Sequence, residues 1–296
     1  MKPYRSMLFV PGHKSSWADK GLASGADALI LDLEDSVPAA NKEEARATVR
    51  ATITRLREQG VRADLWVRPN SVDSGLFGAD VEGVMVDGLA GLFLPKVFSA
   101  REIVGIDAVV SHIEKRENLP QTVELIVSFE TAVSVAAIEE IAAASPRIGS
   151  LLGATGPNAD VGRELGFEFS TEGLETLYLR SRIVLACKAN AIHHPVVGVW
   201  QDIADLEGFR RFALDNRRLG YRGMVVIHPS HVAPSNEIYT PSPETIAHYR
   251  RMVLAFREAE SKGSAAVDFE GQHIDIAHVK TAEAAIARAA ALNGVG

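Results

Sequence analysis

Ionisable side chains follow several apolar runs of this sequence, at the points where buried strands would end. The run "LILDLEDS" closes with three acids within four residues, Asp32, Glu34 and Asp35, and the run "VELIVSFET" carries Glu130 near its end. Clustered carboxylates repel one another and raise one another's pKa unless a cation lies between them. Because an oxygen-rich site with few ligands suits Mg²⁺ or Mn²⁺, these acids predict a site for a divalent metal.

Two basic residues end other apolar runs, Arg68 in "DLWVRPN" and Lys96 in "GLFLPKV". A guanidinium binds a carboxylate, or the oxygen of a developing enolate, through paired hydrogen bonds. Together with a metal, Arg68 therefore indicates a site for a small 2-oxo or 2-hydroxy acid. Lys96 leaves two interpretations open, a Schiff-base lysine and a charge that neutralises the acids. We favour the second, because neighbouring acids raise the pKa of an amine and make it a poor nucleophile.

The stretch "GATGPNADVGRELG", residues 153–166, follows another apolar run and raises two alternatives. It could cradle a phosphate, or it could present Asp160 to a ligand. The stretch has neither a G-x-G-x-x-G pattern nor a G-K-[ST] ending, so the phosphate-loop signal is weak. Its glycines permit the backbone to pass close to a ligand, which favours a loop that presents Asp160.

Eight short apolar runs rich in Val, Ile, Leu and Phe alternate with segments that have helical spacing of apolar residues. This alternation indicates βαβ units and a parallel sheet. The last residues of the eight runs are Val10, Glu34, Arg68, Lys96, Glu130, Gly153, His194 and His228.

The ends of these runs are 23 to 41 residues apart, which suits a (β/α)₈ barrel of roughly 250 residues. A doubly wound open sheet has five or six strands and fits less well. We therefore predict the α/β class, with a (β/α)₈ TIM barrel. Catalytic groups of such barrels lie at the carboxyl ends of the strands, where the acids and bases above are found.

The segment after residue 262 contains a Gly/Ser hinge, a short polar stretch and an Ala-rich helix. We predict a catalytic barrel over residues 1–262 and a C-terminal extension over residues 263–296 that acts as a lid or an oligomer arm.

The composition excludes several classes of protein. The formal net charge is −7, and no block rich in Lys and Arg is present, so a nucleic-acid partner is not expected. The single cysteine, Cys187, excludes a disulfide framework and is expected to be a buried, inert thiol. The sequence contains no run of about 18 apolar residues, so a membrane span is not expected. We expect a cytoplasmic protein.

The motifs "RSMLFVPG", "DALILDLEDSV", "WVRPN", "LPKV", "IVSFETA" and "GATGPNADVGRELG" occur in this order, followed by "VVIHPSHVAPSNEIYTPSPETI". In these motifs the chain resembles the citrate lyase beta-subunit-like proteins, which include malyl-CoA and citramalyl-CoA lyases. They are metal-dependent aldolases of the phosphoenolpyruvate-utilising barrel superfamily. The resemblance runs from about residue 5 to residue 290.

The resemblance implies a metal site and its surroundings. Mg²⁺, or Mn²⁺, would be held by Glu130 and Asp160. Arg68 would contact the carboxylate or enolate of the substrate. Glu34 and Asp35 match acids that hold metal-bound waters.

The resemblance also implies that coenzyme A is part of the substrate. Arg5, Lys14 and Lys20 leave two interpretations open, contact with its phosphates and solvated charges of the kind that loops usually carry. In the stretch "GQHIDIAH", Asp275 matches a family acid that reaches over the active site of a neighbouring subunit. A homotrimer or homohexamer goes with that arrangement.

The activity that the resemblance implies is cleavage of a short 3-hydroxyacyl-CoA, such as malyl-CoA, methylmalyl-CoA or citramalyl-CoA, into an acyl-CoA and glyoxylate or pyruvate. Two alternatives are a citrate lyase beta subunit, which acts on citryl groups carried by an acyl carrier protein, and an aldolase that acts on a free 2-oxo acid. The sequence departs from the family pattern in an insertion at residues 155–158, in Ala277 where Pro is common, and in the absence of Pro-Arg after the first strand.

Overall fold

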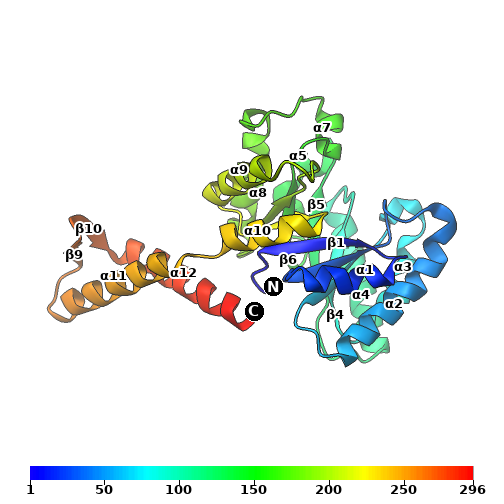
Figure 1. The fold of residues 1–296 in the computed structure, drawn as a ribbon, viewed down its shortest axis with the longest axis horizontal. Helices are drawn as coiled ribbons and strands as arrows, with labels where there is room; N and C mark the ends of the chain where they lie inside the picture. Colours follow the sequence, from blue (N-terminus) through cyan, green and yellow to red (C-terminus); the bar gives the residue numbers. More distant parts are fainter. Residues whose placement is uncertain (296) are drawn as a thin grey trace. The chain divides into compact units, whose positions relative to one another are not determined.

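The computed structural model describes residues 1–295, and the side chains of residues 1–292. The chain divides into two compact units, of which the first runs from Pro3 to Ile238 and the second begins at Tyr239. In the first unit, parallel strands close into a barrel in the order β1 to β8, and Figure 1 shows helices around the outside of the strands. The predicted (β/α)₈ barrel is confirmed.

The barrel strands are β1 (Ser6–Pro11), β2 (Ala28–Asp32), β3 (Asp64–Arg68), β4 (Leu89–Leu94), β5 (Glu124–Phe129), β6 (Ile148–Ala154), β7 (Val196–Gly198) and β8 (Gly223–Val226). The helices of the first unit are α1 (Ser15–Ala23), α2 (Lys42–Glu58), α3 (Phe77–Val84), α4 (Ala100–Arg116), α5 (Ala132–Ala136), α6 (Ile138–Ala142), α7 (Asp160–Leu165), α8 (Leu174–Ala189), α9 (Leu206–Leu219) and α10 (Val232–Tyr239). Three short 3₁₀ turns are η1 (Ala39–Asn41), η2 (Val72–Ser74) and η3 (Pro229–His231).

The predicted strand ends agree with the structure to within two residues for every strand except β7. The prediction of His194 as the end of the seventh strand is wrong. Strand β7 begins at Val196, so His194 precedes the strand and lies at its amino end. The physical reason is Pro195, which cannot donate a ladder hydrogen bond and is tolerated only at a strand's start or edge.

The barrel interior is filled by side chains. Trp66, Phe93, Ile126 and other buried residues form one apolar cluster inside the strands. Gly91 lies beside this cluster, and a Cβ atom there would overlap the ring of Trp66 and lie 2.6 Å from the carbonyl oxygen of Glu124. A glycine at this position is therefore what allows Trp66 to fill the barrel.

We expect Gly91→Ala to destabilise the protein by about 1–3 kcal/mol, because neither the Trp66 ring nor the β5 backbone can move aside freely. The matched control is Gly105→Ala in α4, where a Cβ would meet nothing within 4 Å. That change should be neutral or stabilise the helix by up to about 1 kcal/mol. Urea unfolding measures both values, and equal effects of the two substitutions would contradict this packing.

The second unit contains α11 (Pro243–Ser261), a hairpin of β9 (Ala266–Phe269) and β10 (Gln272–Asp275), and α12 (Ile276–Val295). Figure 1 shows α11 (orange) running beside α12 (red). Met252 and Phe256 of α11 pack against Ile274 and Val279. This apolar contact groups α11 with the C-terminal segment, so the break between compact units comes before α11, whereas we predicted a boundary after it, at residue 262.

Cys187 is fully buried in α8, and burial raises its pKa to about 12. It is therefore the inert thiol that the sequence predicts. None of the described helices combines the length and the apolar composition needed to cross a membrane.

Candidate active site

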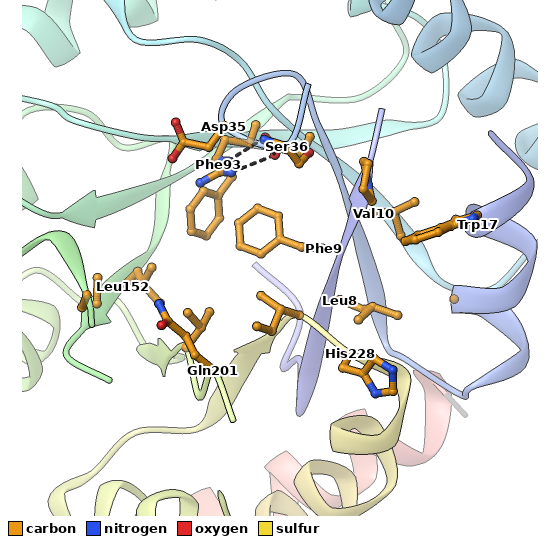
Figure 2. A pocket seen from close by; sticks show the side chains of 18 of the residues that line it. Leu8, Phe9, Val10, Trp17, Asp35, Ser36, Phe93, Leu152, Gln201 and His228 are labelled. Atoms are coloured by element: carbon orange, nitrogen blue, oxygen red, sulfur yellow. Dashed lines mark hydrogen bonds and ion pairs between the residues drawn. The ribbon is translucent and has the colours of Figure 1, made fainter. Parts of the chain in front are cut away.

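A cavity of about 760 Å³ opens at the carboxyl ends of the barrel strands. Five of the ionisable residues in its lining are Asp32, Asp35, Arg68, Glu130 and Asp160. Figure 2 shows the two sides of this cavity, with Asp35 and Ser36 on one side, Gln201 and His228 on the other, and the ring of Phe9 between them. The closed barrel thus brings these five residues together although they are up to 128 positions apart in the sequence.

Arg68, the last residue of β3, is held by two acids from the β2 strand and its loop. Its Nε and Nη2 atoms donate to the two carboxylate oxygens of Asp32, at 2.7 and 2.8 Å. Its Nη1 atom lies 3.0 Å from Glu34 Oε2, and the guanidinium lies over the Phe9 ring at 4.5 Å. Burial disfavours the charge, but Asp32, Glu34 and Glu130 outweigh it and raise the pKa of Arg68 above its ordinary value. Arg68 is therefore a fixed, permanent cation.

Asp32, the first acid of the cluster in "LILDLEDS", also lines the cavity, although the family resemblance gave it no role of its own. It accepts hydrogen bonds from the backbone N–H groups of Glu34 (2.9 Å) and Ser36 (3.1 Å) as well as from Arg68. Burial would raise the pKa of Asp32, but the contacts with Arg68 outweigh burial and keep it low. The sequence feature that points to a partner for Asp32 is its position as the last residue of a fully buried strand, where an unpaired carboxylate would be costly.

Glu34 and Lys96 form a second ion pair beside Arg68, with 2.7 Å between Lys96 Nζ and Glu34 Oε1. Burial raises the pKa of Glu34 to about 7, against the opposing effects of Arg68 and Lys96. Burial would lower the pKa of Lys96, but Glu34 outweighs burial and raises it. Lys96 therefore stays protonated, which supports its interpretation as a neutralising charge and disfavours a Schiff-base lysine.

The raised pKa of Glu34 predicts an unusual pH dependence of stability. The folded protein binds the Glu34 proton more tightly than the unfolded chain does, so protonation of Glu34 stabilises the folded state. This stabilisation is fully present below about pH 4.5 and is lost as the pH rises through about 7. For the metal-free protein in EDTA, the loss amounts to at most about 3 kcal/mol.

The test compares urea unfolding of the protein and of Glu34→Gln across this pH range. We expect the stability gained by the substitution to grow as the pH rises from 4.5 to 7. Glu44→Gln, at an exposed position of α2, is the matched control. A pH-independent difference between Glu34→Gln and the unaltered protein would contradict the assignment.

Glu130, which directly follows β5, and Asp160, the first residue of α7, bring two carboxylates into the same cavity. Burial raises the pKa of Glu130, Arg68 and Lys96 oppose this, and the charge of Asp160 raises it further. Asp160 pairs with the exposed Arg163 one turn further along α7, at 2.6 Å. A divalent cation between the two carboxylates would relieve both burial and repulsion, so the donor set fits a hard metal ion.

Within the described residues, no group of three or more His, Cys, Asp and Glu side chains is arranged as a ready-made metal cage. Mg²⁺ is commonly bound by one or two carboxylates and completes its octahedron with water and substrate oxygens, so a pair such as Glu130 and Asp160 meets its usual requirement.

The insertion at residues 155–158 forms part of the cavity wall next to Asp160. A Cβ atom at Gly156 would overlap the carbonyl oxygen of Val199, so only glycine permits the loop to approach the segment after β7 so closely. Asn158 lies in the left-handed region (φ 54°) and lines the cavity together with Gln201. Of the insertion, Asn158 is thus the residue that faces the cavity and presents a polar side chain to it.

The three basic residues expected at coenzyme A phosphates lie in different places. Lys20 of α1 lines the cavity, and Lys14 lies 4.4 Å from the ring of Trp17, a half-exposed cavity residue. Arg5 precedes β1 at its amino end, and its Nε and Nη2 atoms bind the two oxygens of Asp27 at 2.9 and 2.6 Å. The structure therefore does not bring Arg5 to the cavity, because it lies at the opposite end of the strand.

Asp275 lies in the second unit, as the last residue of β10. Its Oδ1 atom accepts a hydrogen bond from the backbone N–H of Ala277 at 2.9 Å and lies 2.7 Å from His278 Nδ1. The side chain is 46% exposed, and the hydrogen bond with His278 lowers the pKa of Asp275. The structure thus presents Asp275 to solvent as an ionised carboxylate.

The chain is similar to known lyases over almost its whole length. The family model described as HpcH/HpaI aldolase/citrate lyase matches residues 5–229. The chain is 35% identical to an L-malyl-CoA/beta-methylmalyl-CoA lyase of Cereibacter sphaeroides, over 97% of this chain and 95% of that protein. It is 33% identical to the mitochondrial citramalyl-CoA lyase of Homo sapiens, over 95% of this chain and 84% of that protein.

Among solved structures, the chain resembles protein CitE from Mycobacterium tuberculosis, which was solved in complex with magnesium, acetoacetate and coenzyme A. The TM-score is 0.73 at 29% identity, and the match covers 96% of this chain and 97% of that chain. The family model spans about three quarters of the present chain, including every barrel residue of the site. The chain therefore belongs to the HpcH/HpaI aldolase/citrate lyase family of enzymes.

Proposed function

We propose that this protein is a Mg²⁺-dependent carbon–carbon lyase that cleaves a short 3-hydroxyacyl-CoA into an acyl-CoA and a 2-oxo acid. Malyl-CoA, methylmalyl-CoA and citramalyl-CoA are the substrates that we expect, with glyoxylate or pyruvate as the oxo acid. The observation that carries the proposal is the shared cavity of Glu130, Asp160 and Arg68 at the carboxyl ends of the strands. The similarity to two CoA-ester lyases over almost the whole chain supports it.

Glu130 and Asp160 are the residues that would hold the metal, with Glu34 and Asp35 as acceptors for metal-bound water. When bound, Mg²⁺ would supply Lewis-acid stabilisation of negative charge on the oxygens of the oxo acid. Mn²⁺ has the same ligand preferences and could replace it. Lys96 would keep the acid cluster close to neutrality through its contact with Glu34.

Arg68 is placed to bind the carboxylate of the oxo acid. Its Nε and Nη2 atoms donate to Asp32, whereas Nη1 contacts Glu34 as an ion pair at 3.0 Å, so Nη1 and Nη2 each keep an N–H group for a substrate. These two donors form an edge that matches a carboxylate or an enolate oxygen. Because Asp32 holds the guanidinium through Nε and Nη2, Arg68 would need no rearrangement when the substrate binds.

The coenzyme A portion of the bound substrate would extend out of the cavity alongside α1. Lys20 and Trp17 line the cavity there, and Lys14 lies over the Trp17 ring. Such a pair of cations beside an exposed aromatic face suits phosphates next to a planar base. We give Arg5 no part in this contact, because Asp27 occupies it at the other end of β1.

In the reaction, the bond between the carbinol carbon and the α-carbon of the thioester breaks. The hydroxyl group gives its proton to a carboxylate base and becomes the carbonyl group of the oxo acid, while the electron pair of the broken bond moves into the thioester as an enolate. The enolate then takes up a proton at the α-carbon to give the acyl-CoA. Asp275 of a neighbouring subunit is our candidate for the group that exchanges the proton at the α-carbon. A homotrimer or homohexamer would provide that neighbour.

The direct test incubates the purified protein with Mg²⁺ and each of the three acyl-CoA esters, and measures release of glyoxylate or pyruvate. We expect release from at least one ester, and its loss when EDTA is added and in the Asp160→Asn variant. The proposal would be overturned if none of these esters were cleaved with Mg²⁺ or Mn²⁺.

A further inference from the structure

Lys42 occupies an unfavourable place for a lysine. It is the first residue of α2, where the helix dipole disfavours a positive charge. Burial lowers the pKa of Lys42, and the charges of Asp32 and Asp80 oppose this. A partly buried cation at the start of a helix needs hydrogen-bond acceptors close to it, and the structure supplies three of them.

The ammonium group of Lys42 donates to three acceptors from two loops. Its Nζ atom lies 2.6 Å from the carbonyl oxygen of Leu33, 2.6 Å from that of Glu34, and 2.8 Å from Asn70 Oδ1. Because an ammonium has three N–H groups, this set uses all of them. Two of the acceptors are consecutive carbonyls, so Lys42 fixes the peptide planes on both sides of the Glu34 Cα atom.

Asn70 ties the same loop to the one that follows Arg68. Its Nδ2 atom donates to the Leu33 carbonyl oxygen at 3.0 Å and to Asp80 Oδ2 at 2.6 Å. Asp80 is fully buried and also pairs with Arg46 Nε at 2.6 Å. The loops that follow β2 and β3 are therefore cross-linked beneath the cavity by hydrogen bonds to buried or half-buried groups.

We propose that Lys42 is a positioning residue that holds the β2 loop so that the Glu34 carboxylate meets both Lys96 and Arg68. Neither Lys42 nor Glu34 is a lining residue of the cavity, but Glu34 contacts Arg68, which is one. Lys42 therefore acts on the reaction through Glu34 and its contact with Arg68. The inference rests on the proposed function for its kinetic consequence, but the contacts of Lys42 stand independently of any substrate.

The Lys42→Met variant tests this role, because it keeps the length of the side chain and removes its donors. The fold should survive, since the Glu34 carbonyl still accepts from Val37 N–H at 3.1 Å and the Leu33 carbonyl from Asn70. We expect kcat to fall by about 10- to 100-fold with KM for the acyl-CoA changed less than about 2-fold. Arg55→Met is the matched control. Arg55 lies in α2, the same helix as Lys42, and its replacement removes an exposed ion pair with Asp19 of α1.

A double-mutant cycle with Glu34→Gln separates positioning from general destabilisation. If Lys42 acts through Glu34, then Lys42→Met should lower kcat by no more than about 2-fold when Glu34 is already replaced. Equal losses of kcat in the two backgrounds would overturn the proposal. So would full activity of Lys42→Met at a temperature where it is folded.

Hydrogen exchange of the full chain supplies a readout that needs no substrate. In Lys42→Met, the backbone N–H groups of Glu34 and Ser36, which donate to Asp32, should exchange faster than in the unaltered protein and in Arg55→Met. Unchanged exchange in this loop would overturn the inference. An unaltered protein that cleaves no ester would instead overturn the proposed function, so the two failures are distinguishable.

Discussion

The Glu130→Gln variant should lose at least about 100-fold in lyase activity while the metal-free protein becomes no less stable. The amide keeps the shape of the side chain but lacks the charge that a hard metal ion requires. In the metal-free state, burial and the charge of Asp160 both work against ionised Glu130, so a neutral group removes an unfavourable interaction. Activity and stability are thus expected to respond in opposite directions.

Steady-state kinetics with Mg²⁺ and thermal unfolding in EDTA measure the two effects. Glu164→Gln, at an exposed position of α7, is the matched control and should change neither. A Glu130→Gln variant with near-normal activity at saturating Mg²⁺ would contradict the role of Glu130 as a metal ligand. A large loss of stability in EDTA would instead indicate that Glu130 is a structural residue.

The Asp275→Asn variant should be folded and inactive toward acyl-CoA esters. Asparagine caps helices as well as aspartate does, so the hydrogen bonds from the first turn of α12 can be kept while the proton-exchanging carboxylate is removed. An aldolase that acts on a free 2-oxo acid would need no such residue and would retain nearly full activity. Asp268→Asn, in the same hairpin, is the matched control and should be active.

Mixing two inactive variants tests whether Asp275 serves a neighbouring subunit. In oligomers reassembled from Glu130→Gln and Asp275→Asn chains, some sites would combine an intact Glu130 with an intact Asp275 from the next subunit. Random mixing should restore about a quarter of the sites. No recovery of activity in oligomers shown to be mixed would contradict a contribution across the subunit boundary.

The barrel was predictable because strands buried on both faces are short apolar runs, and because their spacing limits the topology. The placement of Glu130, Arg68 and Lys96 followed from that topology, since the carboxyl ends of the strands meet at one face. The contact partners were not predictable in the same way. Asp32 holds Arg68 from an adjacent strand, and that pairing depends on side-chain direction at the strand ends.

Arg5 shows a second limit of prediction from the sequence. It directly precedes a strand, and its motif does not say which end of the strand meets the cavity, so a charge at the amino end was assigned to a phosphate. The extent of the second unit was also not predictable from the sequence, because the apolar face of α11 could pack equally well against the barrel or against α12. Only the contacts of Met252 and Phe256 with Val279 and Ile274 decide between them.

The most direct test of the site is a crystal structure of the protein with Mg²⁺, pyruvate and coenzyme A. We predict one Mg²⁺ with an oxygen of Glu130 and an oxygen of Asp160 at about 2.0–2.1 Å, and the pyruvate carboxylate within hydrogen-bond distance of Arg68. A metal bound by other residues, or a pyruvate that does not contact Arg68, would contradict this account of the site.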